Sequence, residues 1–125
     1  MTQSKFTIDD YGSKQWRNDK GQFHREDGPA IEYKDGSKAW WINGYLHRED
    51  GPAYEGSDGY KEWCINGKSH RLDGPAVRRS DGRKAWWING EQCSEQNFPI
   101  ALIQFLLNCN EKTAQLILEL FNDTI

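Results

Sequence analysis

A unit of 23 residues that repeats three times without a gap constrains the fold of this chain more than any other feature. The full copies span residues 23–45, 46–68 and 69–91, and a half copy over residues 6–22 precedes them. Every full copy carries, in order, His-Arg, Asp-Gly-Pro-Ala, a central Asp-Gly and a closing Lys-x-Trp-x-Ile-Asn-Gly. Repeats of this length each form one small structural unit, so we expect an array of similar units.

The turn residues predict that each copy is a β-hairpin. The Asp-Gly pairs at 35–36, 58–59 and 81–82 predict type I′ turns, which need a positive φ at both central residues. The Asn-Gly pairs at 43–44, 66–67 and 89–90 end the second strand and turn the chain towards the next copy. The segment His-Arg-x-Asp-Gly-Pro then forms a longer link. The sequence therefore predicts a mainly β fold, a tandem array of hairpins in an antiparallel meander.

Alternation along the second strand separates a constant face of the sheet from a variable one. The constant face carries one Trp and one Ile from each copy: Trp40 and Ile42, Trp63 and Ile65, and Trp86 and Ile88. Because these residues never change, we expect the three Trp side chains to be buried where copies stack. The variable face carries different pairs: Ala39 and Trp41, Glu62 and Cys64, and Ala85 and Trp87. An Ala at residues 30, 53 and 76 of the first strand indicates a close backbone contact.

Composition changes after residue 97. Residues 100–107, IALIQFLL, are apolar almost all round, and Asn97 followed by Pro99 is typical of a helix start. Residues 111–121, EKTAQLILELF, place an apolar stripe on one helical face. We therefore expect hairpin repeats over 1–97 and a two-helix hairpin over 98–125. This helical hairpin would cap the open end of the array, with self-association into a homodimer or contact with a partner as the alternatives.

The pattern Trp-x-Ile-Asn-Gly-x-x-His-Arg-x-Asp-Gly-Pro-Ala, over about residues 12–91, resembles the variant subgroup of the MORN (membrane occupation and recognition nexus) repeat family. Trp in place of Tyr, and Arg after His, depart from the commoner form of that repeat. The resemblance implies an elongated, single-layered array that serves as a scaffold or binding surface without catalysis. It also implies a link to bacterial and phage proteins, among which close variants are common.

Charge and cysteine content narrow the class of protein. The chain has 16 Lys and Arg against 19 Asp and Glu, a net charge of -3, so the basic footprint of a nucleic-acid binder is missing. Three Cys with no CxxC spacing predict free thiols in a reducing compartment, and hence a cytoplasmic protein. No stretch approaches the roughly 18 apolar residues of a membrane span, and the N-terminus does not resemble a signal peptide.

The repeated His residues are expected to be structural. One His per copy, each followed by Arg, gives no metal-ligand spacing. The pattern His-Arg-x-Asp instead predicts that each link is tied to the next link by hydrogen bonds and Arg–Asp pairs. Cys64, which replaces a Trp, is interpreted as drift rather than as a nucleophile. We expect no cofactor, no metal site and no enzymatic activity.

Two functions of different class remain. The first is a protein-binding module that acts by occupying its partner, because Trp, Tyr and Arg are enriched in interface hot spots. Its candidate contacts are aromatic residues along the hairpins and basic residues around the third turn: Trp41, Trp87, Tyr33, Tyr54, Tyr60, Arg78, Arg79, Arg83 and Lys84. The basic residues are interpreted either as a solvated turn or as a contact for an acidic protein surface or phosphates.

The resemblance to phage proteins narrows the first function to a phage-encoded inhibitor of a bacterial defence system, acting in the host cytoplasm. The second function is attachment to a membrane surface or to phosphoinositides, or a scaffold role, as the family name implies. Net acidity argues against membrane attachment.

Overall fold

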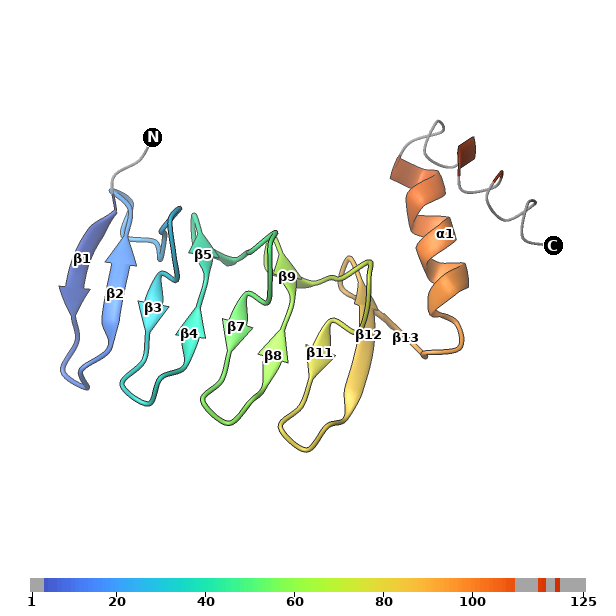
Figure 1. The fold of residues 1–125 in the computed structure, drawn as a ribbon. Helices are drawn as coiled ribbons and strands as arrows, with labels where there is room; N and C mark the ends of the chain where they lie inside the picture. Colours follow the sequence, from blue (N-terminus) through green and yellow to red (C-terminus); the bar gives the residue numbers. More distant parts are fainter. Residues whose placement is uncertain (1–3, 110–114, 117–118, 120–125) are drawn as a thin grey trace.

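The computed structural model describes residues 4–109, 115–116 and 119, and within them thirteen strands are followed by one helix (Figure 1). Nine strands form one antiparallel sheet. In sheet order they are β1 (Lys5–Ile8), β2 (Lys14–Arg17), β3 (Ile31–Glu32), β4 (Lys38–Ala39), β7 (Tyr54–Glu55), β8 (Lys61–Glu62), β11 (Val77–Arg78), β12 (Lys84–Ile88) and β13 (Glu91–Cys93). The hairpins lie side by side in a single layer, and the expected antiparallel meander is confirmed.

Each Asn-Gly pair closes a second, smaller hairpin that spans the boundary at the end of its copy. The first two of these hairpins form separate two-stranded sheets, β5 (Trp41–Ile42) with β6 (Tyr45–Leu46) and β9 (Cys64–Ile65) with β10 (Lys68–Ser69). In the third copy the Asn-Gly turn joins β12 to β13. Asn43 and Gly44 have φ values of 47° and 84°, and the other two pairs are alike, so these are the type I′ turns.

The Asp-Gly turns do not have the expected type I′ geometry, so that prediction is wrong. Only the Gly has a positive φ, 94° at Gly36, and its N–H donates to the carbonyl of Tyr33 at 3.0 Å. The loop therefore has three residues, a type I turn completed by a Gly in the left-handed region. The Asp35 carboxylate accepts a hydrogen bond from the Ser37 N–H at 2.8 Å, which holds Asp in its turn conformation.

The constant Trp of each copy marks the point where the chain leaves the large sheet. The Trp40 N–H donates to the carbonyl of Ala53 at 2.7 Å, and the Trp40 carbonyl accepts from the His47 N–H at 3.0 Å. The next link residue, Arg48, donates its N–H to the carbonyl of Cys64 in its own copy at 3.1 Å, whereas Trp40 belongs to the preceding copy. Each His-Arg link thus joins the backbones of two successive copies.

Small residues fill the interior of this single layer. Ala30, Ala53 and Ala76 are 0% exposed, so the expected close backbone contact is confirmed. The expectation that Trp40, Trp63 and Trp86 are buried is wrong, because all three are only half-buried. A one-layered sheet has no second layer to cover a large ring, and the indoles lie on its open surface.

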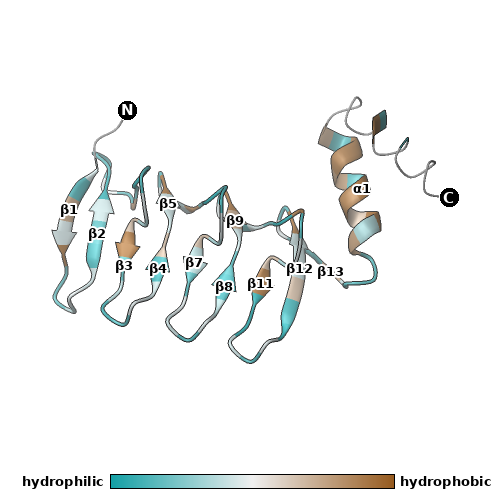
Figure 2. Cartoon of the chain, viewed as in Figure 1, coloured by the Kyte–Doolittle hydropathy of each residue, from teal (hydrophilic) through white to brown (hydrophobic). Residues whose placement is uncertain are grey.

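Helix α1 (Phe98–Cys109) begins directly after Asn97, as the sequence predicts. It contacts β12, and the Phe105 ring lies 5.2 Å from the His70 ring. Figure 2 shows that apolar residues concentrate along α1, yet no side chain within Phe98–Cys109 is fully buried. The second helix expected over 111–121 lies outside the described residues, apart from 115–116 and 119. Within the part of the chain that the structure describes, no helix has the length and apolarity needed to cross a bilayer.

Candidate functional site

The pairing register separates the two faces of the sheet. Residues directly opposite each other in an antiparallel pair point to the same face. One face carries a row of cross-strand neighbours, here called the charged row: Lys14, Glu32, Lys38, Glu55, Lys61, Arg78 and Lys84. The opposite face carries the row Gln15, Ile31, Ala39, Tyr54, Glu62, Val77 and Ala85. A charged surface and a more apolar one therefore lie on opposite sides of one layer.

On the charged face, an Arg from each link lies flat over the Trp of the preceding copy. The guanidinium carbon lies 3.9 Å from the ring centroid in the pairs Arg25–Trp16, Arg48–Trp40 and Arg71–Trp63. This cation–π contact supplies the cover that a second layer would give. The Gly of Asp-Gly-Pro leaves room for it, since a Cβ at Gly51 would lie 2.9 Å from the Arg48 Cζ.

The same Arg residues make the predicted ion pairs with Asp, but each pair lies within one link, so the expectation that these pairs tie one link to the next is wrong. Arg Nε lies 2.9 Å from an Asp Oδ1 in each link: Arg25–Asp27, Arg48–Asp50 and Arg71–Asp73. Arg48 Nη1 also donates to the carbonyl of Pro52 at 3.1 Å and lies 3.4 Å from Glu55 Oε1 of the charged row. The link, the indole and the charged row are thus held together by one side chain.

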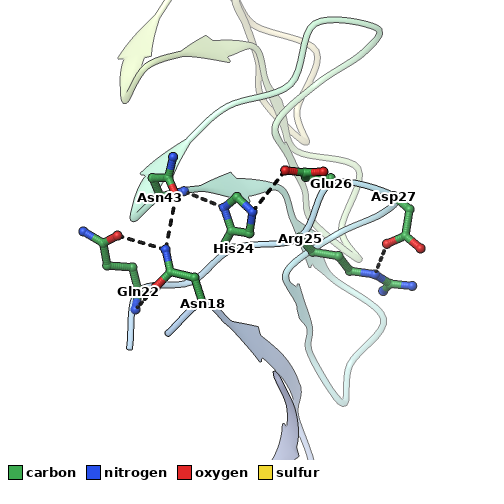
Figure 3. A network of polar contacts seen from close by, with 7 residues as sticks. All are labelled: Asn18, Gln22, His24, Arg25, Glu26, Asp27 and Asn43. Atoms are coloured by element: carbon green, nitrogen blue, oxygen red, sulfur yellow. Dashed lines mark hydrogen bonds and ion pairs between the residues drawn. The ribbon is translucent and has the colours of Figure 1, made fainter. Parts of the chain in front are cut away.

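The His residues tie each link to the Asn-Gly turn at the end of the same copy (Figure 3). Asn43 N–H donates to His24 Nδ1 at 3.0 Å, and the same bond joins Asn66 to His47 and Asn89 to His70. An Nδ1 that accepts a hydrogen bond requires the neutral ring with its proton on Nε2. Burial lowers the pKa of His70, which favours that form. The structural role expected for these residues is confirmed.

The opposite face carries a cluster of three tyrosines from the candidate list. The ring centroids of Tyr33 and Tyr54 are 6.5 Å apart, and those of Tyr54 and Tyr60 are 5.9 Å apart. Tyr33 is 37% exposed, and the other two are half-buried. We call Tyr33, Tyr54 and Tyr60 the tyrosine cluster, which joins the first and second copies across neighbouring hairpins.

A polar centre lies beside this cluster, and sequence reasoning missed it. The Glu62 carboxylate accepts hydrogen bonds from Tyr60 Oη at 2.9 Å, Ser69 Oγ at 2.7 Å and Cys64 Sγ at 3.6 Å. Burial, and then the Glu62 charge, raise the pKa of Cys64 to about 12, so its thiol stays protonated and is a poor nucleophile. The sequence signal for this polar centre is that Glu62 and Cys64 together replace the Ala and Trp that the other two copies have at these positions.

The remaining candidates are two Trp residues and four basic residues. Trp41 is half-buried, with its ring 5.5 Å from Phe23, and its buried Nε1 has no hydrogen-bond partner among the described residues. Trp87 is half-buried and lies opposite Gln92. The basic residues are exposed: Arg78 and Lys84 belong to the charged row, and Arg83 pairs with Asp81 at 2.7 Å. Burial and the hydrogen bond to Glu62 raise the pKa of Tyr60 to about 12, and the Arg79 charge opposes that rise.

These features define a single-layered β-hairpin repeat protein with two chemically different faces. No protein-family model matches the chain, and neither a curated protein nor a solved structure matches it. Among the described residues, no group of three or more His, Cys, Asp and Glu side chains is placed to hold a metal ion.

Proposed function

We propose that this protein is a non-catalytic binding module that acts by occupying the surface of a protein partner. The tyrosine cluster is the observation that carries the proposal. Tyr offers a large contact area and loses little side-chain freedom on binding, which makes it a frequent interface anchor. The sheet beneath it is held by backbone hydrogen bonds between copies and by His-Asn hydrogen bonds within each copy, so the three rings are presented on a rigid support.

The variant Tyr54→Ala tests this proposal, because Tyr54 contacts both other members of the cluster. Immobilised wild-type protein should capture a partner from a lysate of the source cells. Tyr54→Ala should weaken that capture by about thirtyfold, the effect of losing a hot-spot residue. Tyr45→Ala is the matched control, since Tyr45 is 59% exposed and forms no part of the cluster. Equal capture by both variants, with unchanged melting temperatures, would contradict the proposal.

A narrower form of the proposal makes the partner a component of a bacterial defence system and the protein a phage-encoded inhibitor. Its support is the repeat resemblance alone. Expression in bacteria that carry a defined defence system, followed by phage challenge, tests it. Restored plaque formation is the expected result, and unchanged plating across all systems tried would refute it.

We also infer that α1 closes the C-terminal end of the array. The support is the contact of α1 with β12 and of Phe105 with His70. β13 is the last strand of the sheet, and an open strand edge invites pairing with another chain.

A further inference from the structure

In the first two copies the charged row alternates in sign. Glu32 lies directly between Lys14 and Lys38, and Glu55 lies between Lys38 and Lys61, each on adjacent strands. Opposite charges in cross-strand pairs stabilise a sheet, while like charges directly opposite each other destabilise it. Up to Lys61 the row therefore follows the arrangement that favours folding.

The third copy breaks this alternation. Arg78 occupies the place that Glu32 and Glu55 hold in the earlier copies, so Lys61, Arg78 and Lys84 are direct neighbours on three adjacent strands. We call these three residues the cationic triplet. All three are exposed, and none forms an ion pair with another described residue. The arrangement costs stability, so folding does not explain it.

The link Arg of the third copy pairs with one carboxylate, as Arg25 does with Asp27 although Glu32 is present in that copy. Arg48 pairs with both Asp50 and Glu55, at 2.9 and 3.4 Å. Arg71, the equivalent residue one copy later, pairs with Asp73 at 2.9 Å, and Arg78 stands where a second carboxylate would be. Uncompensated positive charge is thus concentrated at one end of a protein whose net charge is -3.

We propose that the cationic triplet binds a short acidic segment of the protein partner. This inference rests on the proposed function and names the chemistry of one partner contact. Strands are spaced by about 4.8 Å, so three neighbouring cations span roughly 10 Å. An extended peptide covers that span with about three residues, which matches a short run of Asp and Glu.

The surroundings favour an acidic protein segment over a nucleic acid. A groove between the links on the charged face is lined by four carboxylates, Glu26, Asp27, Glu49 and Asp50, and by two Arg residues. Arg25 and Arg48 pair with the two Asp, so Glu26 and Glu49 leave the groove with net negative charge. They would repel a long polyanion laid along the array, whereas a short segment meets only the triplet. Carboxylates form charge-assisted hydrogen bonds with Arg and Lys, and such complementarity sets specificity and the rate of association.

The experiment measures binding of a fluorescein-labelled hexaglutamate peptide to the purified full chain by fluorescence anisotropy at low salt. The variant Arg78→Glu restores the alternating row, so it should fold at least as well as the wild type. Its affinity for the peptide should fall by about tenfold or more, because one cation becomes an anion at the centre of the site. Lys20→Glu makes the same charge change at an exposed turn of the half copy and should leave the affinity within about twofold.

Three results would overturn the inference: no binding of the peptide by the wild type, equal losses in Arg78→Glu and Lys20→Glu, or tighter binding of oligothymidylate or phosphatidylserine vesicles than of the peptide. The experiment needs no natural partner, so its outcome is separate from that of the Tyr54→Ala capture. If the Tyr54→Ala comparison contradicts the tyrosine proposal while the peptide still binds through Arg78, that proposal is refuted and the acidic-ligand site is retained.

Discussion

In the second copy, one Arg side chain joins the link, the indole of the preceding copy and the charged row. Arg48 covers Trp40, pairs with Asp50 and Glu55, and donates to the Pro52 carbonyl. Lys would keep the charge but lose the planar stack and the forked hydrogen bonds. We expect Arg48→Lys to lower the free energy of unfolding in urea by about 1–2 kcal/mol.

Arg83→Lys is the control for this prediction. Arg83 is 75% exposed and pairs with Asp81 alone, so its replacement should cost less than about 0.5 kcal/mol. Similar losses in the two variants would show that Trp40 gains nothing from its guanidinium cover.

The hydrogen bond from the Asn89 N–H to His70 Nδ1 makes stability depend on pH. Protonation of Nδ1 removes the acceptor, and burial lowers the pKa of His70 from its ordinary value of 6.5. A lowered pKa means that the unfolded chain binds the proton more readily. The contribution is therefore present above pH 6.5 and is lost as the pH falls through the lower, folded-state pKa.

His70→Asn tests this dependence, because the Asn side-chain oxygen can accept the same bond without titrating. Thermal melts of the wild type should show a fall in melting temperature between about pH 7 and pH 5. The fall should be shallower in His70→Asn. An equal slope in both proteins would place the pH dependence elsewhere.

At the scale of the elements, the sequence predicted the hairpins, their order and the role of the His-Arg links, because these follow from repeated turn residues and from residue types with few alternatives. It did not predict the register. A two-residue loop at Asp35-Gly36 would place Tyr33 opposite Lys38, whereas the three-residue loop places Glu32 there. A shift of one residue moves every side chain to the other face. The residues of the charged row therefore cannot be identified from the sequence without the length of the turn loop.

The sequence predicts many residues of the candidate site but not how they group. Aromatic and basic residues could be selected from composition and position, but their grouping depends on contacts between copies. The tyrosine cluster joins Tyr33 of the first copy to Tyr54 and Tyr60 of the second, and the cationic triplet takes Lys61 from one copy and Arg78 from the next. A constant apolar residue in a repeat resembles a core residue, which is why the sequence predicts buried Trp side chains. The sequence pattern gives no sign that an Arg side chain covers the Trp ring.

At the scale of the whole molecule, each copy contacts mainly its neighbours, so stability is a sum of contributions from the copies and the interfaces between them. The two ends then matter most, since each lacks one neighbour. At the C-terminal end Ile88 is only 6% exposed, and it lines a shared depression with Cys93, Ala101 and Phe105. Helix α1 thus supplies part of the cover that a further copy would give.

Deletion of residues 98–125 should therefore weaken the array from that end. Ile88 would become accessible, and an exposed apolar residue beside the open edge of β13 favours association with another chain. We expect a lower melting temperature and concentration-dependent light scattering. Phe105→Ala, which removes the contact with His70 but keeps the helix, should lower the melting temperature by a smaller amount without association. A truncated chain as stable and as monomeric as the parent would show that the helix is no cap. Its exposed apolar residues, among them Ile100 and Leu107, would then make α1 the better candidate for the binding element, with the sheet as its support.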